Sequence, residues 1–389
     1  MASRVPTPTT AVRIPISKPL VGELEHERIG RVLDSGWLTQ GEETFEFERR
    51  VAEYCGARHG VAMNSATTAL HVALELIGVG PGDEVIVPSY SHIATANAVA
   101  YTGAEPVFAD IRARTYNLDE TRLEEALSER TRAIVVVHQV GLPADLQAIA
   151  AFAGEHGLRV VEDAACALGS TYDGRRIGGH GNLAVLSFHP RKVITTGEGG
   201  MVLTDDPELA ESARSLASHG EAVIDVHRHN ALRPTTEEFA RVGFNYRMTN
   251  LQGALGVGQM SRLEEILAAR RELGRRYSEA FGRLSGVEVP LEPPGYEPNY
   301  QSYMLNVTAA GATPRDRVML GLRERGIATR PGVTAIHHQP PYRRPAGRER
   351  LQETDKAVEQ ALILPLYPQM THAEQDEVIE AFTELVAEP

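Results

Sequence analysis

Seven short apolar segments between residues 61 and 204, most of them separated by stretches of helical periodicity, constrain the fold more than any other feature. The segments are residues 61–63, 84–87, 105–109, 133–138, 159–162, 184–188 and 201–204. Helical patterns such as residues 67–77 and 146–156 lie between them. Strands that alternate with helices are typical of a mostly parallel sheet covered by helices on both faces. We therefore predict an α/β fold for this part of the chain.

The pattern changes after about Val257. A long charged amphipathic helix is predicted over residues 259–284, followed by a loop rich in Pro, Gly and Glu, a strand at 303–307, and helices at 314–325 and 371–386. The 389 residues are enough for two or three domains. We predict a disordered arm over residues 1–12, a large domain over 13–257 and a smaller C-terminal α+β domain over 258–389.

Composition and charge exclude several classes of function. The net charge of −13 argues against nonspecific nucleic-acid binding, which needs a basic face. No apolar run reaches the ~18 residues of a membrane span, and the N-terminus lacks the apolar segment of a secretory signal. The two cysteines, Cys55 and Cys166, are too few for a disulfide framework. We expect a cytoplasmic protein without membrane or nucleic-acid partners, and we predict no metal site.

Two segments carry the strongest chemical signal. The first, VVEDAA (160–165), places Asp163 at the end of a buried strand, where a carboxylate is costly unless it is paired. The second, LSFHPRK (186–192), ends in Lys192, which follows Asp163 by 29 residues (192 − 163) and precedes a glycine-rich turn. Ligands of open α/β sheets bind at the carboxyl ends of strands, so one excursion of the chain brings both residues to the same edge.

A lysine and a carboxylate at one sheet edge fit pyridoxal phosphate (PLP). This cofactor needs a lysine amine for its Schiff base and a carboxylate that keeps its pyridine nitrogen protonated. The released lysine then acts as a general base. Taken alone, each residue has an alternative interpretation without a cofactor. Asp163 would then be an ordinary residue at a strand end, and Lys192 would be a solvated surface residue.

An upstream helix start offers an anion site. Ser65 is a good N-cap for the helix at residues 67–77, and the free N–H groups and dipole of a helix N-terminus attract anions. The cofactor phosphate fits there, with the Ser187 hydroxyl as a second donor. The alternative is a simple capped helix.

Taken in order, these motifs resemble the DegT/StrS-type sugar aminotransferases within the fold-type I PLP enzymes. The resemblance covers nearly the whole chain. Besides the segments above, it rests on LDSGWLTQG (33–41), GDEVIVPS (82–89), GFNYRMTN (243–250) and LPLYP (364–368). It implies an aspartate-aminotransferase-like fold, a homodimer and an active site shared between its subunits.

The resemblance also implies roles for individual residues. Lys192 would form the Schiff base, Asp163 would pair with the pyridine nitrogen, and Ala66, Thr67 and Ser187 would hold the phosphate. Asn245 would reach the phosphate of the neighbouring subunit. His337 and Tyr342 would line the substrate pocket, where Arg330 and Arg228 are further candidates for binding an anionic substrate. Arg228 lies between His227 and His229 in a loop at residues 221–242, whose alternative reading is a solvated basic turn.

Three cofactor-binding positions depart from the family pattern. Ala66 replaces a common glycine, but its backbone N–H can still donate. His92 stands where an aromatic ring often stacks on the cofactor, so its protonation state matters. Cys166 stands where Gln or His often lies near the phenolic oxygen, and a thiol is a weaker donor. The alternative for Cys166 is a small buried hydrophobic residue.

Several activities remain open at this point. The first is transfer of an amino group, with glutamate as the expected donor, to a nucleotide-linked keto-sugar. The second is transamination of a keto-cyclitol or another specialised carbonyl compound. A PLP-dependent sugar dehydratase, which in this family carries histidine in place of the lysine, is disfavoured by Lys192, and a non-catalytic regulator by the intact Lys192, Asp163 and Ser187. Substrate pockets are built from loops, so the sequence does not name the sugar.

Overall fold

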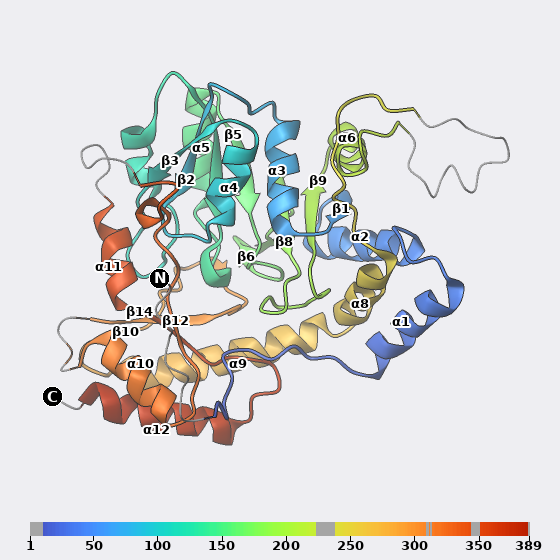
Figure 1. The fold of residues 1–389 in the computed structure, drawn as a ribbon. Helices are drawn as coiled ribbons and strands as arrows, with labels where there is room; N and C mark the ends of the chain where they lie inside the picture. The colour runs from blue at the N-terminus through green and yellow to red at the C-terminus, as the bar shows by residue number, and fades with distance from the viewer. Residues whose placement is uncertain (1–10, 223–237, 309–310, 312, 344–350, 388–389) are drawn as a thin grey trace, which may run out of the picture.

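The computed structural model describes residues 11–222, 238–308, 311, 313–343 and 351–387, and a seven-stranded sheet forms its centre (Figure 1). The strands are β1 (His59–Met63), β2 (Glu84–Pro88), β3 (Glu105–Ala109), β4 (Thr131–Val137), β5 (Arg159–Asp163), β8 (Leu183–Ser187) and β9 (Gly200–Thr204). Their order is β1-β9-β8-β5-β4-β2-β3, and only β9 runs antiparallel to its neighbours. The predicted mostly parallel α/β sheet is confirmed, and each predicted segment overlaps one strand.

Helices cover both faces of this sheet. On one face lie α3 (Ala66–Leu76), α4 (Ala94–Tyr101) and α6 (Pro207–Ala217). On the other lie α2 (Glu42–Cys55), α5 (Leu146–His156) and α8 (Asn250–Met260). Within β2, Val85 and Val87 pack toward the first layer and Ile86 toward the second, so both faces of the strand are buried. This two-sided burial explains why the strands are continuous apolar runs.

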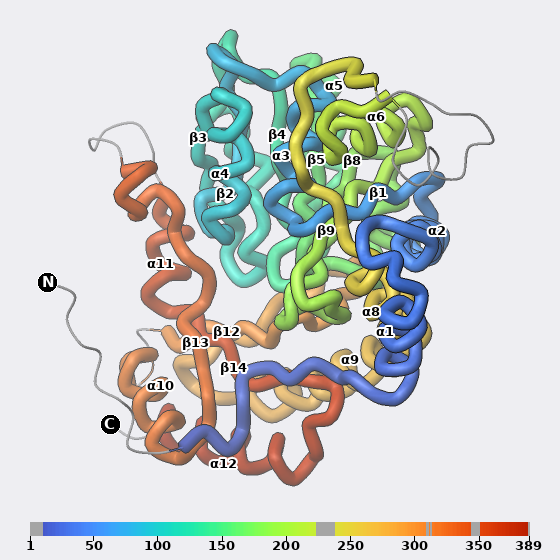
Figure 2. Tube along the Cα trace, turned by 45° about the vertical axis from the view of Figure 1, so that its right-hand side comes forward, coloured from blue at the N-terminus to red at the C-terminus, as the bar shows by residue number. Residues whose placement is uncertain are grey.

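The C-terminal part forms a smaller α+β layer beside the large sheet (Figure 2). Its antiparallel sheet has the order β10-β12-β14-β13. These strands are β10 (Val287–Glu288), β12 (Tyr303–Val307), β13 (Arg330–Pro331) and β14 (Ala361–Leu364), and the helices are α9 (Leu263–Phe281), α10 (Arg315–Glu324), α11 (Gln352–Gln360) and α12 (His372–Ala387). Ile14, near the start of the chain, packs in the hydrophobic cluster of this C-terminal part and forms an isolated β-bridge with Ile327. The predicted domain boundaries stay predictions.

The remaining elements are short or peripheral. They are α1 (Glu23–Ser35), the 3₁₀ turns η1 (Glu120–Ala126), η2 (Gln139–Gly141) and η3 (Ile336–His338), and a small sheet of β6 (Thr171–Tyr172), β7 (Arg175–Arg176) and β11 (Tyr296–Glu297). Within the described ranges, no helix has both the length and the apolar character needed to cross a membrane.

The single helix predicted over residues 259–284 was wrong at its start. The chain instead forms α8, which ends at Met260, and then α9, which begins at Leu263. At the junction the guanidinium Nε of Arg262 lies 3.3 Å from the buried carboxylate of Glu25 on α1. This contact joins residues more than two hundred positions apart, so the local charge pattern could not reveal where one helix ends and the next begins.

The topology brings several strand ends to one edge. Because β9 is antiparallel to both β1 and β8, β1 runs in the same direction as β8, β5 and β2. The carboxyl ends of these four strands therefore lie on the same side of the sheet. Ligands of open α/β sheets bind at this side.

Candidate active site

Lys192 lies in the loop that connects β8 to β9, at the carboxyl edge of the sheet. Its backbone N–H donates to the carbonyl of His189 at 2.8 Å, and its Nζ lies 3.1 Å from Sγ of Cys166. The chain has three lysines. Lys18 and Lys356 are exposed, whereas Lys192 is partly buried. Lys192 is thus the one lysine of the three that is partly buried, with its amine in contact with Cys166.

Asp163, the last residue of β5, is 5% exposed and carries hydrogen bonds from neutral donors. The hydroxyl of Thr95 on α4 donates to Oδ2 at 2.8 Å, and the backbone N–H of Ala165 donates to Oδ1 at 3.2 Å. Among the described residues, no cationic side chain forms an ion pair with this carboxylate. A buried carboxylate without a cation favours a positively charged partner from a ligand. The protonated pyridine nitrogen of PLP fits that requirement.

His92 follows the end of β2. It lies close enough to Lys192 and Asp163 for their charges to affect its pKa. Although the His92 side chain is exposed, desolvation by the surrounding protein, and then the positive charge of Lys192, lower its pKa, while Asp163 opposes the shift. The direction of this shift favours the neutral imidazole, the form that can stack on a cofactor ring without adding positive charge.

The residues predicted to hold the phosphate meet through Gly200. In the ladder between β8 and β9, Ser187 pairs with Gly200. A Cβ at Gly200 would lie 2.4 Å from the backbone nitrogen of Ala66, so only glycine lets β9 approach the start of α3 so closely. The Ser65 side chain caps the N–H of Thr68, and no hydrogen bond to the N–H of Ala66 or Thr67 occurs among the described residues. These groups can therefore bind an anion at the helix N-terminus.

Asn245 is exposed, and its backbone lies beside Asn64, the residue directly before the Ser65 N-cap of the anion site. Its carbonyl accepts from Nδ2 of Asn64 at 3.4 Å, and the N–H of Asn64 donates to the carbonyl of Tyr246 at 2.8 Å. The N-cap of α8 is Thr249, which forms a capping box with Gln252. Asn245 therefore does not serve as the N-cap of α8.

The substrate candidates lie farther toward the C-terminal part. His337, in η3, has its Nδ1 2.6 Å from Oγ of Ser89 at the end of β2. The Tyr342 hydroxyl donates to Oδ1 of Asn97 on α4 at 2.6 Å. Arg330 is exposed on β13. Arg228 lies outside the described residues.

Sequence reasoning missed the polar partners of these residues. Thr95, Ser89 and Asn97 each contact a candidate residue, and His338 and Asp355 lie beside His337. A serine or threonine in a predominantly apolar segment gives no sign of which distant group it will contact.

The backbone of Cys166 is held by a hydrogen bond, because Nδ2 of Asn299 donates to its carbonyl at 2.8 Å.

Comparison with known proteins gives consistent matches along the chain. The family model described as the DegT/DnrJ/EryC1/StrS aminotransferase family matches residues 19–383. GDP-perosamine synthase from Caulobacter vibrioides is 39% identical over 376 residues, which cover 96% of this chain and 98% of that protein. The aminotransferase TlmJ from Streptoalloteichus hindustanus superimposes with a TM-score of 0.88 at 36% identity, covering 96% of this chain and 99% of that chain. The PLP form of a proposed sugar aminotransferase from Streptococcus pneumoniae has a TM-score of 0.87 at 28% identity, covering 96% and 98% of the two chains.

Proposed function

The chain belongs to the DegT/DnrJ/EryC1/StrS aminotransferase family and is a PLP-dependent aminotransferase, and from this premise we propose that it aminates a keto-sugar carried by a nucleotide. GDP-perosamine synthase, a relative that matches nearly the full length of this chain, supports a sugar nucleotide as the acceptor. Glutamate is the proposed amino donor, and the cytoplasm is the proposed location.

The observation that carries the catalytic proposal is the buried Asp163 carboxylate, without a cation among the described residues, at the same edge as Lys192. Bound PLP supplies an electron-accepting ring that stabilises negative charge on the substrate carbon. Asp163 would hold the proton on the ring nitrogen. Lys192 would anchor the cofactor and, once its amine is released, move the proton between two carbons.

The other residues would bind and orient the cofactor. The N–H groups of Ala66 and Thr67 and the hydroxyl of Ser187 would hold the phosphate. His92, in its neutral form, would stack on the ring. The Cys166 thiol, in contact with the amine of Lys192, would set the position of that amine before the reaction. Arg330, His337 and Tyr342 are the proposed contacts to the acceptor.

The substrate proposal is tested by comparing acceptors under one set of conditions. PLP-loaded enzyme is given glutamate and a panel of nucleotide-linked keto-sugars, the same sugars without nucleotide, and keto-cyclitols, and formation of 2-oxoglutarate is followed. We expect kcat/KM to be highest for a nucleotide-linked sugar. We also expect it to fall with added salt, because exposed charge pairs are screened over about 8–10 Å at physiological ionic strength. A preference for uncharged sugars or cyclitols would contradict the proposal.

We further propose a homodimer in which Asn245 completes the partner's phosphate site. Asn245 is exposed, and its backbone lies beside Asn64, directly before the Ser65 cap. In a two-fold dimer each contact occurs twice, so each site would receive one Asn245. Placing Asn245 at the surface beside the anion site supports this arrangement.

Mixing two inactive variants tests the shared site. Lys192→Ala and Asn245→Ala homodimers are each expected to be inactive or nearly so. In a mixed dimer, one site carries both defects and the other carries neither, so up to half of the wild-type activity per mixed dimer should return after subunit exchange. The measurement is activity against mixing ratio, with unmixed variants as controls. If no mixture recovers activity although exchange is verified by mass, each subunit holds a complete site.

A further inference from the structure

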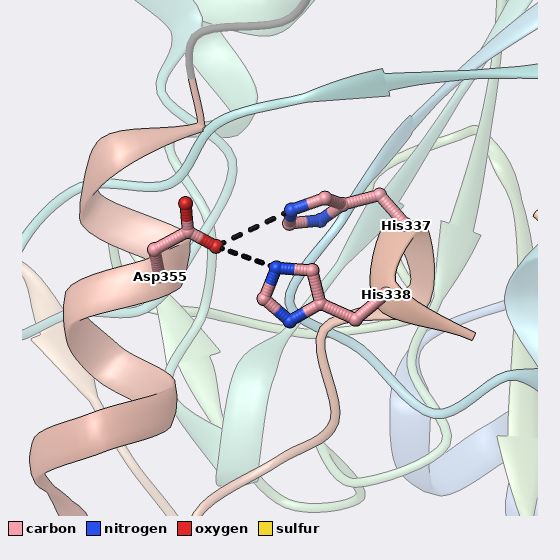
Figure 3. Close-up of side chains that lie close together, drawn as sticks. All are labelled: His337, His338 and Asp355. Carbon is pink, nitrogen blue, oxygen red and sulfur yellow. Dashed lines mark ion pairs between the residues drawn. The ribbon is translucent and has the colours of Figure 1, made fainter. Parts of the chain in front are cut away.

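Three side chains outside the proposed cofactor site converge on one point. His337 and His338 from η3 direct their Nε2 atoms at Oδ1 of Asp355 on α11, at 3.3 and 3.0 Å (Figure 3). The two imidazole rings lie side by side, with their centroids 4.1 Å apart. One ligand atom from each residue lies within 4.8 Å of the other two. Two imidazoles and one carboxylate form a set typical of zinc-class ions.

The spacing fits a tetrahedral ion. With zinc–ligand bonds of about 2.0–2.1 Å, neighbouring ligands of a tetrahedron lie about 3.3 Å apart. The two Nε2–Oδ1 separations, 3.3 and 3.0 Å, are already near this value. The side chains of His338 and Asp355 are 48% and 52% exposed. Small side-chain rotations can therefore adjust the distance between the ligand nitrogens of the two histidines. The fourth position of a tetrahedral ion would remain open to water.

Partners outside the cluster hold the ligands in place. Nδ1 of His337 lies 2.6 Å from Oγ of the buried Ser89, which orients the ring with Nε2 toward Asp355. The buried Asp110 accepts hydrogen bonds from the backbone N–H groups of Glu353 and Thr354, which fixes the first turn of α11. Metal-binding histidines usually have their second nitrogen held in this way.

We propose that His337, His338 and Asp355 bind a divalent transition-metal ion of the zinc class. The ion ties η3, next to the end of β2, to the first turn of α11. Nε2 of His337 then faces the ion, so this residue contacts the acceptor through the ion's open position rather than directly. The metal site itself does not depend on the proposed acceptor, because metal binding is measured without substrate.

The test titrates chelator-treated, PLP-loaded enzyme with Zn²⁺ by calorimetry and with Co²⁺ by visible absorption, which reports four-coordinate geometry. We expect one ion per chain and a higher Tm at saturating Zn²⁺. His338→Gln and Asp355→Asn should each weaken binding by about 100-fold or more, because losing only an outer partner of a metal-bound histidine costs about 10–100-fold. Ser89→Ala should weaken it by about tenfold.

The matched control is His372→Gln. His372 forms an exposed pair with a single carboxylate, Glu272, at 2.9 Å, and its loss should leave Zn²⁺ affinity unchanged. Circular dichroism verifies that each variant is folded. The proposal is overturned if the wild-type enzyme binds no stoichiometric Zn²⁺, or if the double variant His338→Gln/Asp355→Asn binds Zn²⁺ as tightly as the wild type. In either case the three residues form only an ion-pair cluster, and the aminotransferase assignment is unaffected.

Discussion

Lys192→Ala is expected to abolish transamination and to leave PLP bound without a covalent link. General acid–base catalysis alone contributes about 10²–10⁴-fold, and this variant also loses the covalent anchor, so we expect turnover to fall by about 10⁴-fold or more. The measurement is the rate of 2-oxoglutarate formation from glutamate, together with absorption of the bound cofactor. Dialysis should remove PLP from the variant much faster than from the wild type.

The small number of lysines makes this prediction sharp. Borohydride reduction of the wild-type enzyme followed by peptide mapping should place the cofactor on Lys192 and not on Lys18 or Lys356, the other two lysines of the chain. Lys356→Ala, a change at an exposed residue paired with Glu353, serves as the control and should retain full activity. Normal turnover by Lys192→Ala, or a label on another lysine, would contradict the assignment.

Asp163→Asn should still bind PLP but should slow the proton-transfer step by about 10²–10³-fold, the usual cost of removing one preorganised electrostatic partner. A carboxylate beside a cationic nitrogen stabilises the charged form of both groups, and an amide does not. The measurement is the single-turnover rate with glutamate and with glutamate deuterated at its α carbon. We expect a larger isotope effect in the variant, because proton transfer becomes fully rate-limiting.

Thr95 provides a graded comparison at the same carboxylate. Thr95→Val removes the hydrogen bond to Oδ2 of Asp163, whereas Thr95→Ser keeps a hydroxyl at that position. A hydrogen bond to a charged group contributes about 1.5–3 kcal/mol, so the valine variant should be slowed by about 10- to 150-fold and the serine variant should resemble the wild type. If the single-turnover rate of Asp163→Asn and its isotope effect both remain close to those of the wild type, Asp163 has only a structural role.

Elements with strong local patterns could be read from the sequence. The strand predicted at residues 105–109 and the helix predicted at 146–156 coincide with β3 and α5. Other elements were not predicted, among them the peripheral, strongly charged helix α1 and the brief strands β13 and β14. Short strands gain their stability from pairing with distant partners, and a single segment does not report those partners.

The same distinction applies to the candidate site. A carboxylate at a strand end and a lysine after the next strand identified Asp163 and Lys192, because the chemistry of PLP and the geometry of parallel sheets restrict where such residues stand. Their placement at one edge agrees with that expectation, while their catalytic roles stay predictions. Thr95, 68 residues before Asp163, carried no comparable signal.

The sequence by itself determined the fold class, the family and the residue types needed for the chemistry, because burial periodicity and short motifs are local properties of the chain. Only the tertiary structure decided which polar groups meet. Ser89 and His337 are 248 residues apart, and His337, His338 and Asp355 have no spacing that predicts a metal site, yet the end of β2, η3 and α11 converge. Contacts of this kind depend on strand order and on how the C-terminal layer packs against the large sheet. Those features arise from the sum of many distant hydrophobic contacts, and no single segment of the sequence encodes them.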